Sequence, residues 1–280
     1  MSHLIRFGIQ TPQQHGTWHE MLSLWQEVDT LGFDTAWVFD HFLPISSDPT
    51  GPCLEGWTSL AALAMATKNV RVGVMMTGNT YRHPPVLAKM ATTVDLISGG
   101  RLILGVGGGW FELEHQAYGM PFPRIAERVA RLDEALEVIK RLWTEEKVNF
   151  AGKYYQLSDA PFQPKPAQKP HPPILVGAGG ERVALGIVAR HADMWNTFGT
   201  PDVFRHKIAV LAEHCHRVGR DPATIEKSVL IPGAPNVEEA RKQIEEYVAV
   251  GVTHLIYSIS SPYDHRTLRR FAQEVIPAFR

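Results

Sequence analysis

Short apolar runs alternate with longer amphipathic segments about eight times along the 280-residue chain. A strand of a parallel sheet is covered on both faces and therefore reads as a continuous apolar run, as residues 36–39 do, and residues 5–10 are predicted to form the first strand. Residues 19–31, which follow, instead place Met21, Trp25 and Val28 on one helical stripe. Because such strands and helices alternate, the pattern predicts a parallel sheet.

Eight strands and eight helices follow from this pattern. Gly32 ends the first helix as a C-cap glycine, and Pro84 and Pro85 open another because proline is favoured in a first turn. The predicted strands are residues 5–10, 33–39, 70–75, 101–106, 174–176, 193–198, 225–231 and 254–259. The predicted helices are residues 19–31, 57–67, 84–97, 125–143, 182–190, 201–218, 237–250 and 263–279.

The number and order of these elements predict the fold class. At this length a closed (β/α)8 TIM barrel fits better than an open, doubly wound sheet, which is the alternative. We expect one domain over residues 1–280, with an insertion at about 110–173 after the fourth strand. The insertion contains a short hairpin at 148–157 and an extended surface loop, 161–173, that holds six prolines.

Composition excludes several classes of function. The formal net charge of −1 gives no attraction to nucleic acid or to an anionic membrane. No apolar run approaches the ~20 residues of a membrane helix, and the first residues lack the apolar stretch of a signal peptide. The two cysteines, Cys53 and Cys215, do not form a disulfide framework. We therefore expect a cytoplasmic protein that binds neither nucleic acid nor membranes.

Metal binding is not expected either. Residues 213–216 are all ligand types, but they lie within a predicted helix and point around its circumference. Glu112 and His115 are three positions apart and could share a face, but they have no partner at a metal-ligand spacing.

Asp40 and His41 directly follow the second predicted strand. Catalytic side chains in α/β barrels lie at the carboxyl ends of strands, and a histidine there can pass a proton near neutral pH. Asp40 can orient that histidine or accept a hydrogen bond from a ligand ring. The alternative is a structural polar cluster that caps the barrel.

Three further strand ends carry polar residues or glycine. Met75, Met76 and Asn79 belong to a segment that could line a planar ligand, or be a plain loop. Two glycine runs follow later strands: Gly107, Gly108 and Gly109, and then Gly177, Ala178, Gly179 and Gly180. Glycine lets a backbone approach a ligand closely, and successive N–H groups before a helix can hold phosphate.

The motifs together resemble the bacterial luciferase-like monooxygenase family, and within it the branch of coenzyme F420-dependent (deazaflavin) oxidoreductases. The resemblance covers nearly the whole chain. It is carried by TAWVFDHF at 35–42, NTYRHPPVLAK at 79–89, ISGGRLILGVGGGW at 97–110, PPILVG at 172–177 and ADMWN at 192–196.

The resemblance implies a flavin-like ring at the carboxyl ends of the strands. Asp40 would contact the ring, and His41 would donate or accept a proton beside the reacting carbon. A non-proline cis peptide would occur at Met75-Met76, next to the ring. The cofactor-binding positions implied are Asp40, Met75, Met76, Asn79, Gly107, Gly108, Gly109, Gly177, Ala178, Gly179 and Gly180. Related barrels often pair, which implies a homodimer.

One departure concerns the residue after the fourth-strand glycines. The deazaflavin sugar-phosphate dehydrogenases carry a catalytic glutamate there, whereas this chain has Trp110, with Glu112 as a substitute candidate. Trp110, Glu112 and Phe42 are the expected substrate-pocket residues, and apolar neighbours suggest an apolar organic substrate.

Three functions stay open. The first is F420-dependent hydride transfer to or from an organic substrate. The second is an FMN-dependent monooxygenase that uses oxygen and a flavin reductase partner. The third is a barrel that binds a flavin without catalysis.

Overall fold

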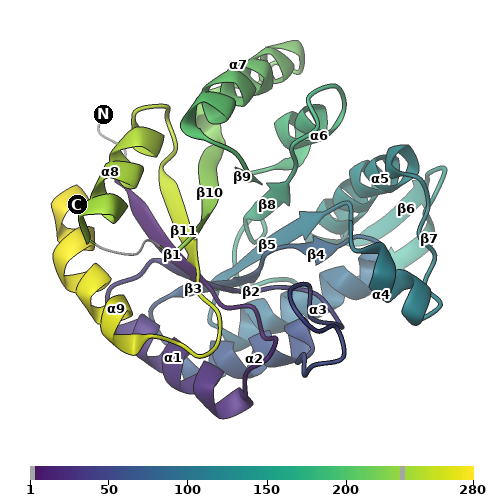
Figure 1. The fold of residues 1–280 in the computed structure, drawn as a ribbon. Coiled ribbons are helices and arrows are strands. Elements are labelled where there is room, and N and C mark those ends of the chain that lie inside the picture. Colours follow the sequence, from purple (N-terminus) through teal and green to yellow (C-terminus); the bar gives the residue numbers. More distant parts are fainter. Residues whose placement is uncertain (1–3, 234–236) are drawn as a thin grey trace.

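Eight parallel strands close into a barrel in the computed structural model, which describes residues 4–233 and 237–280 (Figure 1). β1 pairs with β2 and β11, and β3 pairs with both β2 and β5, which closes the ring. The barrel strands are β1 (Arg6–Gln10), β2 (Thr35–Val38), β3 (Arg71–Val74), β5 (Leu102–Gly107), β8 (Ile174–Gly177), β9 (Met194–Thr197), β10 (Glu226–Pro232) and β11 (His254–Ser258). The predicted TIM barrel is therefore confirmed, and the open sheet is wrong.

Helices surround the strands (Figure 1). They are α1 (Trp18–Thr30), α2 (Gly56–Ala66), α3 (Pro84–Ile97), α5 (Ile125–Thr144), α6 (Ala184–His191), α7 (Pro201–Arg217), α8 (Val237–Val248) and α9 (His265–Arg270). A 3-10 turn, η1 (Pro222–Thr224), follows α7. Each helix lies within a predicted segment or departs from it by one or two residues, except for the last, because local capping decides where helices begin and end.

The last helix differs from the prediction of one continuous helix over 263–279. It begins at His265 because the Asp264 side chain accepts hydrogen bonds from the backbone N–H groups of Arg266 and Thr267. After Arg270 it continues as a π-turn, η2 (Phe271–Val275), and a 3-10 turn, η3 (Ile276–Phe279). Pro277 lies in that final turn and has no N–H to extend an α-helix.

The core has an outer and an inner part. Residues of β2 alternate, so that Ala36 and Val38 pack beneath the helices while Trp37 points to the opposite face. The inner cluster, in the barrel lumen, consists of Trp37, Met75, Ile103, Leu175, Met194 and Ile256. Because these side chains fill the lumen, a ligand must bind above them, at the carboxyl ends of the strands.

The segment between β5 and β8 carries elements beyond the simple strand-helix repeat. A short helix that the sequence did not predict, α4 (Glu112–Ala117), precedes α5. β6 (Lys147–Ala151) and β7 (Gln156–Pro161) form the predicted hairpin, which extends further than residues 148–157. Outside this segment, a two-residue strand, β4 (Thr77–Gly78), follows β3 in the chain and pairs with β5.

Among the described residues, no helix combines the length and the apolar character needed to cross a membrane. The same residues contain no group of three or more histidine, cysteine, aspartate or glutamate side chains placed to hold a metal ion.

Candidate active site at the carboxyl ends of the strands

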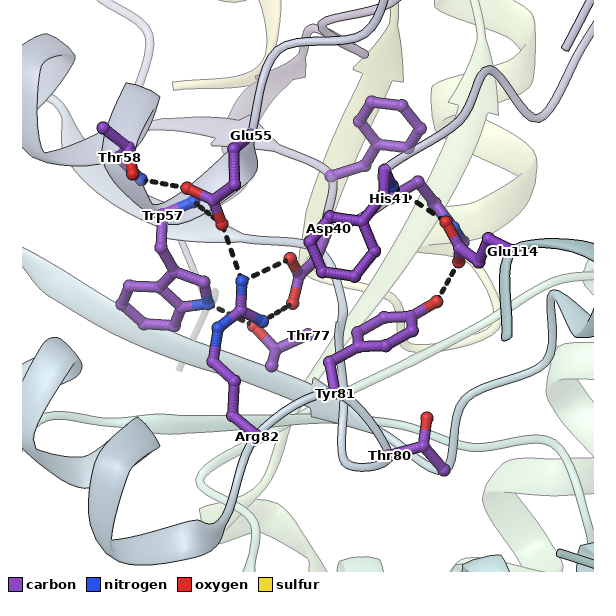
Figure 2. Close-up of polar contacts among 12 residues, drawn as sticks. Asp40, His41, Glu55, Trp57, Thr58, Thr77, Thr80, Tyr81, Arg82 and Glu114 are labelled. Carbon is purple, nitrogen blue, oxygen red and sulfur yellow. Dashed lines mark hydrogen bonds and ion pairs between the residues drawn. The ribbon is translucent and has the colours of Figure 1, made fainter. Parts of the chain in front are cut away.

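His41 follows β2 and lies buried at the mouth of the barrel, with 7% of its surface exposed. Its Nδ1 atom is 2.7 Å from Oε1 of Glu114, on the short helix α4 (Figure 2). The imidazole ring otherwise lies among aromatic rings, with centroid distances of 5.0 Å to Phe39, 5.5 Å to Trp110 and 5.6 Å to Phe111. Glu114 is therefore the polar partner that orients this ring.

Glu114 is fully buried and accepts three hydrogen bonds. Besides His41, its donors are the Tyr81 hydroxyl and the backbone N–H of Phe42, at 2.8 Å from Oε2. Burial raises the pKa of Glu114, but the bonds from His41, Tyr81 and Phe42 outweigh it and hold this pKa below its usual value. A charged carboxylate only accepts hydrogen bonds, so Nδ1 of His41 carries a proton and Nε2 is the atom left for a ligand.

Asp40 lies in a buried ion pair, with 1% of its surface exposed. Arg82 donates to both of its oxygens, at 2.6 Å and 3.1 Å, and to Glu55 at 2.6 Å (Figure 2). Glu55 also caps α2 by accepting from the backbone N–H groups of Trp57 and Thr58. Burial raises the pKa of Asp40, and the nearby charge of Arg82 offsets only part of that effect. A contact between Asp40 and a cofactor ring stays a prediction.

The segment after β3 carries the cis bond that the resemblance implied, between Met75 and Met76. The carbonyl of Met75 accepts a hydrogen bond of 3.0 Å from Gln10. Asn79 is also buried, and its Nδ2 donates to the Tyr155 hydroxyl at 3.2 Å. Its Oδ1 has no hydrogen-bond partner among residues 4–233 and 237–280.

The two glycine runs lie side by side because β5 and β8 pair with Gly107 opposite Gly177. Met76 packs against both: a Cβ added at Gly177 would lie 2.7 Å from its Cγ, and one at Gly107 would lie 3.6 Å from its Cβ. A Cβ at Gly108 would meet no described atom within 4 Å. Gly108 therefore borders open space.

The remaining glycine-run positions are held by neighbouring elements. Gly109 has a φ of +77°, and a Cβ there would approach the Thr80 hydroxyl to 2.6 Å. Ala178 uses its N–H and its carbonyl in bonds to β9, so its backbone polar groups are already engaged. Lys207 donates to the carbonyl of Gly179 at 2.6 Å, and Gly180 accepts from the N–H of Leu185 in α6.

The predicted substrate-pocket residues separate in the structure. Trp110 is 61% exposed, and its ring lies beside His41. Phe42 stacks edge-on against Tyr81 and Tyr118. Glu112 is exposed and accepts a hydrogen bond from Gln116, so the structure does not bring it to His41.

Sequence reasoning missed Glu114, Tyr81 and Arg82 as site residues. Glu114 is 73 positions from His41, and no spacing rule connects them. Hydrophobic patterning of residues 112–117 gave no signal for it, because the apolar Leu113 is exposed in α4 while the polar Glu114 and His115 are buried.

A family model described as luciferase-like monooxygenase matches residues 1–274. The chain belongs to this family. The fold of this chain is also similar to that of a solved structure described as an F420-dependent secondary alcohol dehydrogenase in complex with an F420-acetone adduct. That structure superposes with a TM-score of 0.89 over 99% of both chains, at 21% identity.

Curated relatives of this luciferase-like chain differ in cofactor. An F420-dependent glucose-6-phosphate dehydrogenase of Amycolatopsis mediterranei is 40% identical over 56% of this chain and 46% of its own length. An FMNH(2)-dependent dimethylsulfone monooxygenase of Pseudomonas putida is 31% identical over 70% of this chain and 53% of its own length. The chain thus spans about half the length of these relatives.

Proposed function

We propose that this protein is a coenzyme F420-dependent oxidoreductase that acts on a small organic substrate. The observation that carries the proposal is the buried imidazole of His41, which Glu114 orients at the mouth of a luciferase-like barrel. The F420-dependent relative from Amycolatopsis mediterranei supports the choice of cofactor.

The residues at the mouth fit a flavin-like ring with a phosphate tail. Asn79 has a buried Oδ1 without a partner among the described residues, which suits a ring N–H donor. Gly108 faces open space beside Gly107 and Gly177, where a ligand can approach the backbone. When bound, a deazaflavin accepts or donates a hydride at ring carbon five, and the protein positions and shields it.

His41 would manage the proton that accompanies the hydride. Its Nε2 would accept the proton from a substrate hydroxyl during oxidation and return it during reduction, a role worth roughly 10²–10⁴-fold in rate. Phe39, Trp110 and Phe111 surround the imidazole and would exclude water from it. These rings favour an apolar substrate over a charged one.

A second candidate function is FMN-dependent oxygenation, which the dimethylsulfone monooxygenase relative favours. It would need a flavin reductase as partner, whereas the F420 proposal needs none. We also propose that residues 1–280 act as one domain with an insertion at 110–173. A homodimer, a cytoplasmic location, and the lack of nucleic-acid or membrane binding stay predictions.

Titration with each cofactor tests the proposal. The fluorescence of oxidised F420 should be quenched on binding. 2-propanol or glucose 6-phosphate then serves as a trial substrate, and loss of F420 absorbance measures turnover. Oxygen uptake with chemically reduced FMN is measured in parallel. Quenching followed by loss of F420 absorbance with a trial substrate, without oxygen uptake, supports the proposal, whereas quenching without turnover of any substrate supports a barrel that binds the cofactor without catalysis. Oxygen uptake with reduced FMN alone establishes the second function, and binding of neither cofactor refutes both.

A further inference from the structure

The polar surroundings of His41 differ on the two sides of its ring. On the Nδ1 side, Glu114 accepts through the same Oε1 atom from His41 and from the Tyr81 hydroxyl (Figure 2). On the Nε2 side, the described residues give no hydrogen bond. An imidazole caged by aromatic rings has few other partners, so Glu114 alone decides which nitrogen is protonated.

We propose that Glu114 and Tyr81 are positioning residues for His41. Glu114 fixes the tautomer with Nδ1 protonated and Nε2 free, and Tyr81 keeps the Glu114 carboxylate charged by donating to it. The catalytic use of this arrangement rests on the proposed function, but the arrangement itself belongs to the protein without cofactor.

The proton transfer is balanced as follows. During oxidation the substrate O–H bond would break, its proton would bond to Nε2 of His41 and the imidazole would become a cation. The electron pair of the O–H bond would form the new C=O bond as the substrate carbon releases its hydride, for which the proposed deazaflavin would be the acceptor. The Nδ1–H bond is retained and now donates to Glu114 in a charge-assisted hydrogen bond. No proton moves to Glu114, because the bonds from His41, Tyr81 and the Phe42 backbone together hold the pKa of this carboxyl below its usual value.

Other charged or titratable groups near His41 have partners of their own. Arg82 occupies both oxygens of Asp40 and also binds Glu55. Burial, aided by the charge of Glu114, raises the pKa of the Cys53 thiol to about 12, so that it stays neutral; its Sγ donates to the backbone carbonyl of His41. His115 stacks on Tyr81 and bonds through its two nitrogens to Phe111 and Thr80. Glu114 is therefore the anion that contacts the imidazole.

The test follows the imidazole of His41 by NMR titration of the cofactor-free protein, with E114Q, Y81F and E112Q compared with the parent. E114Q removes an anion, so His41 should become protonated at lower pH. Y81F removes a hydrogen-bond donor to Glu114. The carboxylate then interacts more strongly with Nδ1 of His41, so His41 should become protonated at higher pH. Glu112 is exposed on the same short helix and accepts a hydrogen bond from Gln116, so E112Q should leave the titration of His41 as in the parent.

The kinetic readout is the split between kcat and KM. E114Q should lower kcat by roughly 10²–10⁴-fold, because an amide at this position can donate to Nδ1 and invert the tautomer, while KM changes little. Y81F should lower kcat by roughly tenfold.

Shifts of opposite sign in E114Q and Y81F support the proposal, since a merely structural role would not produce them. An unchanged His41 titration in E114Q, or shifts of the same sign, overturns it. If E114Q does not fold, Y81F decides alone, because its His41 should become protonated at higher pH than in the parent. Because the titration needs no cofactor, failure of F420 turnover with these shifts present rejects the proposed function only.

Discussion

Arg82 binds Asp40 through both carboxylate oxygens, at 2.6 Å and 3.1 Å, in a pair that is almost fully buried. Asp40, which the family resemblance predicts to contact a cofactor ring, is thus bound by Arg82, which follows the next barrel strand. Through Glu55, the same guanidinium is attached to the N-terminus of α2. The pair fixes the backbone on which His41 stands.

Removing Arg82 should therefore destabilise the fold. R82Q leaves a buried carboxylate without its partner, which should lower the free energy of unfolding by about 3–5 kcal/mol in urea denaturation. R131Q is the control, because Arg131 pairs with Glu127 on the surface of α5 and such pairs contribute less than about 1 kcal/mol. The double variant R82Q/D40N should recover part of the loss. Equal stability of R82Q and the parent would contradict this account of the pair.

His41 should be needed for turnover and not for cofactor binding. Replacing it by alanine should slow turnover at least ~100-fold while F420 affinity changes only a few-fold, because the ring handles a proton and does not anchor the ligand. Steady-state kinetics and fluorescence titration measure the two effects. Exposed His19 provides the control variant, H19Q. Unchanged turnover in H41A would remove His41 from the mechanism.

Gly108 offers a direct test of where the cofactor binds. A Cβ at this position meets no described atom within 4 Å, so G108A and G108V should leave the melting temperature nearly unchanged. If the open space holds the cofactor, affinity should fall in order of side-chain size, and by at least tenfold for valine. Undiminished F420 affinity in G108V would place the cofactor elsewhere.

Stability should depend on pH through His254, which lies fully buried on β11 and bonds to the Thr35 hydroxyl at 2.9 Å. Burial, with a smaller contribution from the charge of Arg6, holds the pKa of His254 well below its usual value. The unfolded chain therefore binds a proton more readily, and the stabilisation is complete above about pH 6.5 and lost below it. Between pH 6.5 and 5.5 the loss is at most about 1.4 kcal/mol.

Two variants isolate this effect in urea unfolding at pH 7.5 and 5.5. H254N should show a weaker decrease in stability on acidification than the parent. Burial raises the pKa of Glu226, so the folded protein takes up that proton more readily and opposes the trend; E226Q should therefore steepen it. Identical pH slopes for H254N and the parent would show that another group is responsible.

The fold was predictable because each element carries its own local signal. The continuous apolar run before Asp40 could be satisfied only by a covered strand, and Gly32 and Pro84 mark helix ends by backbone chemistry alone. The resemblance added the cis bond at Met75-Met76, which no periodicity predicts. Element ends differed from the prediction where a side chain caps a helix, as Asp264 does at the start of α9.

The candidate site was predictable only in part. Strand ends identified His41 and the glycine runs, because the ends of parallel strands meet at one face of the barrel. Glu114 and Arg82 were missed, since each acts through a partner on a different element, 73 and 42 positions away along the chain. Glu112 was the carboxylate favoured by sequence, but it is exposed and accepts a hydrogen bond from Gln116.

The sequence by itself determined the barrel and the strand end at which His41 stands. It could do so because hydrophobic periodicity and turn chemistry act between neighbours in the chain. Only the tertiary structure decided which carboxylate orients His41 and which cation pairs with Asp40. Those pairings depend on how separate elements pack together, and burial together with the paired group then sets the pKa of each carboxyl.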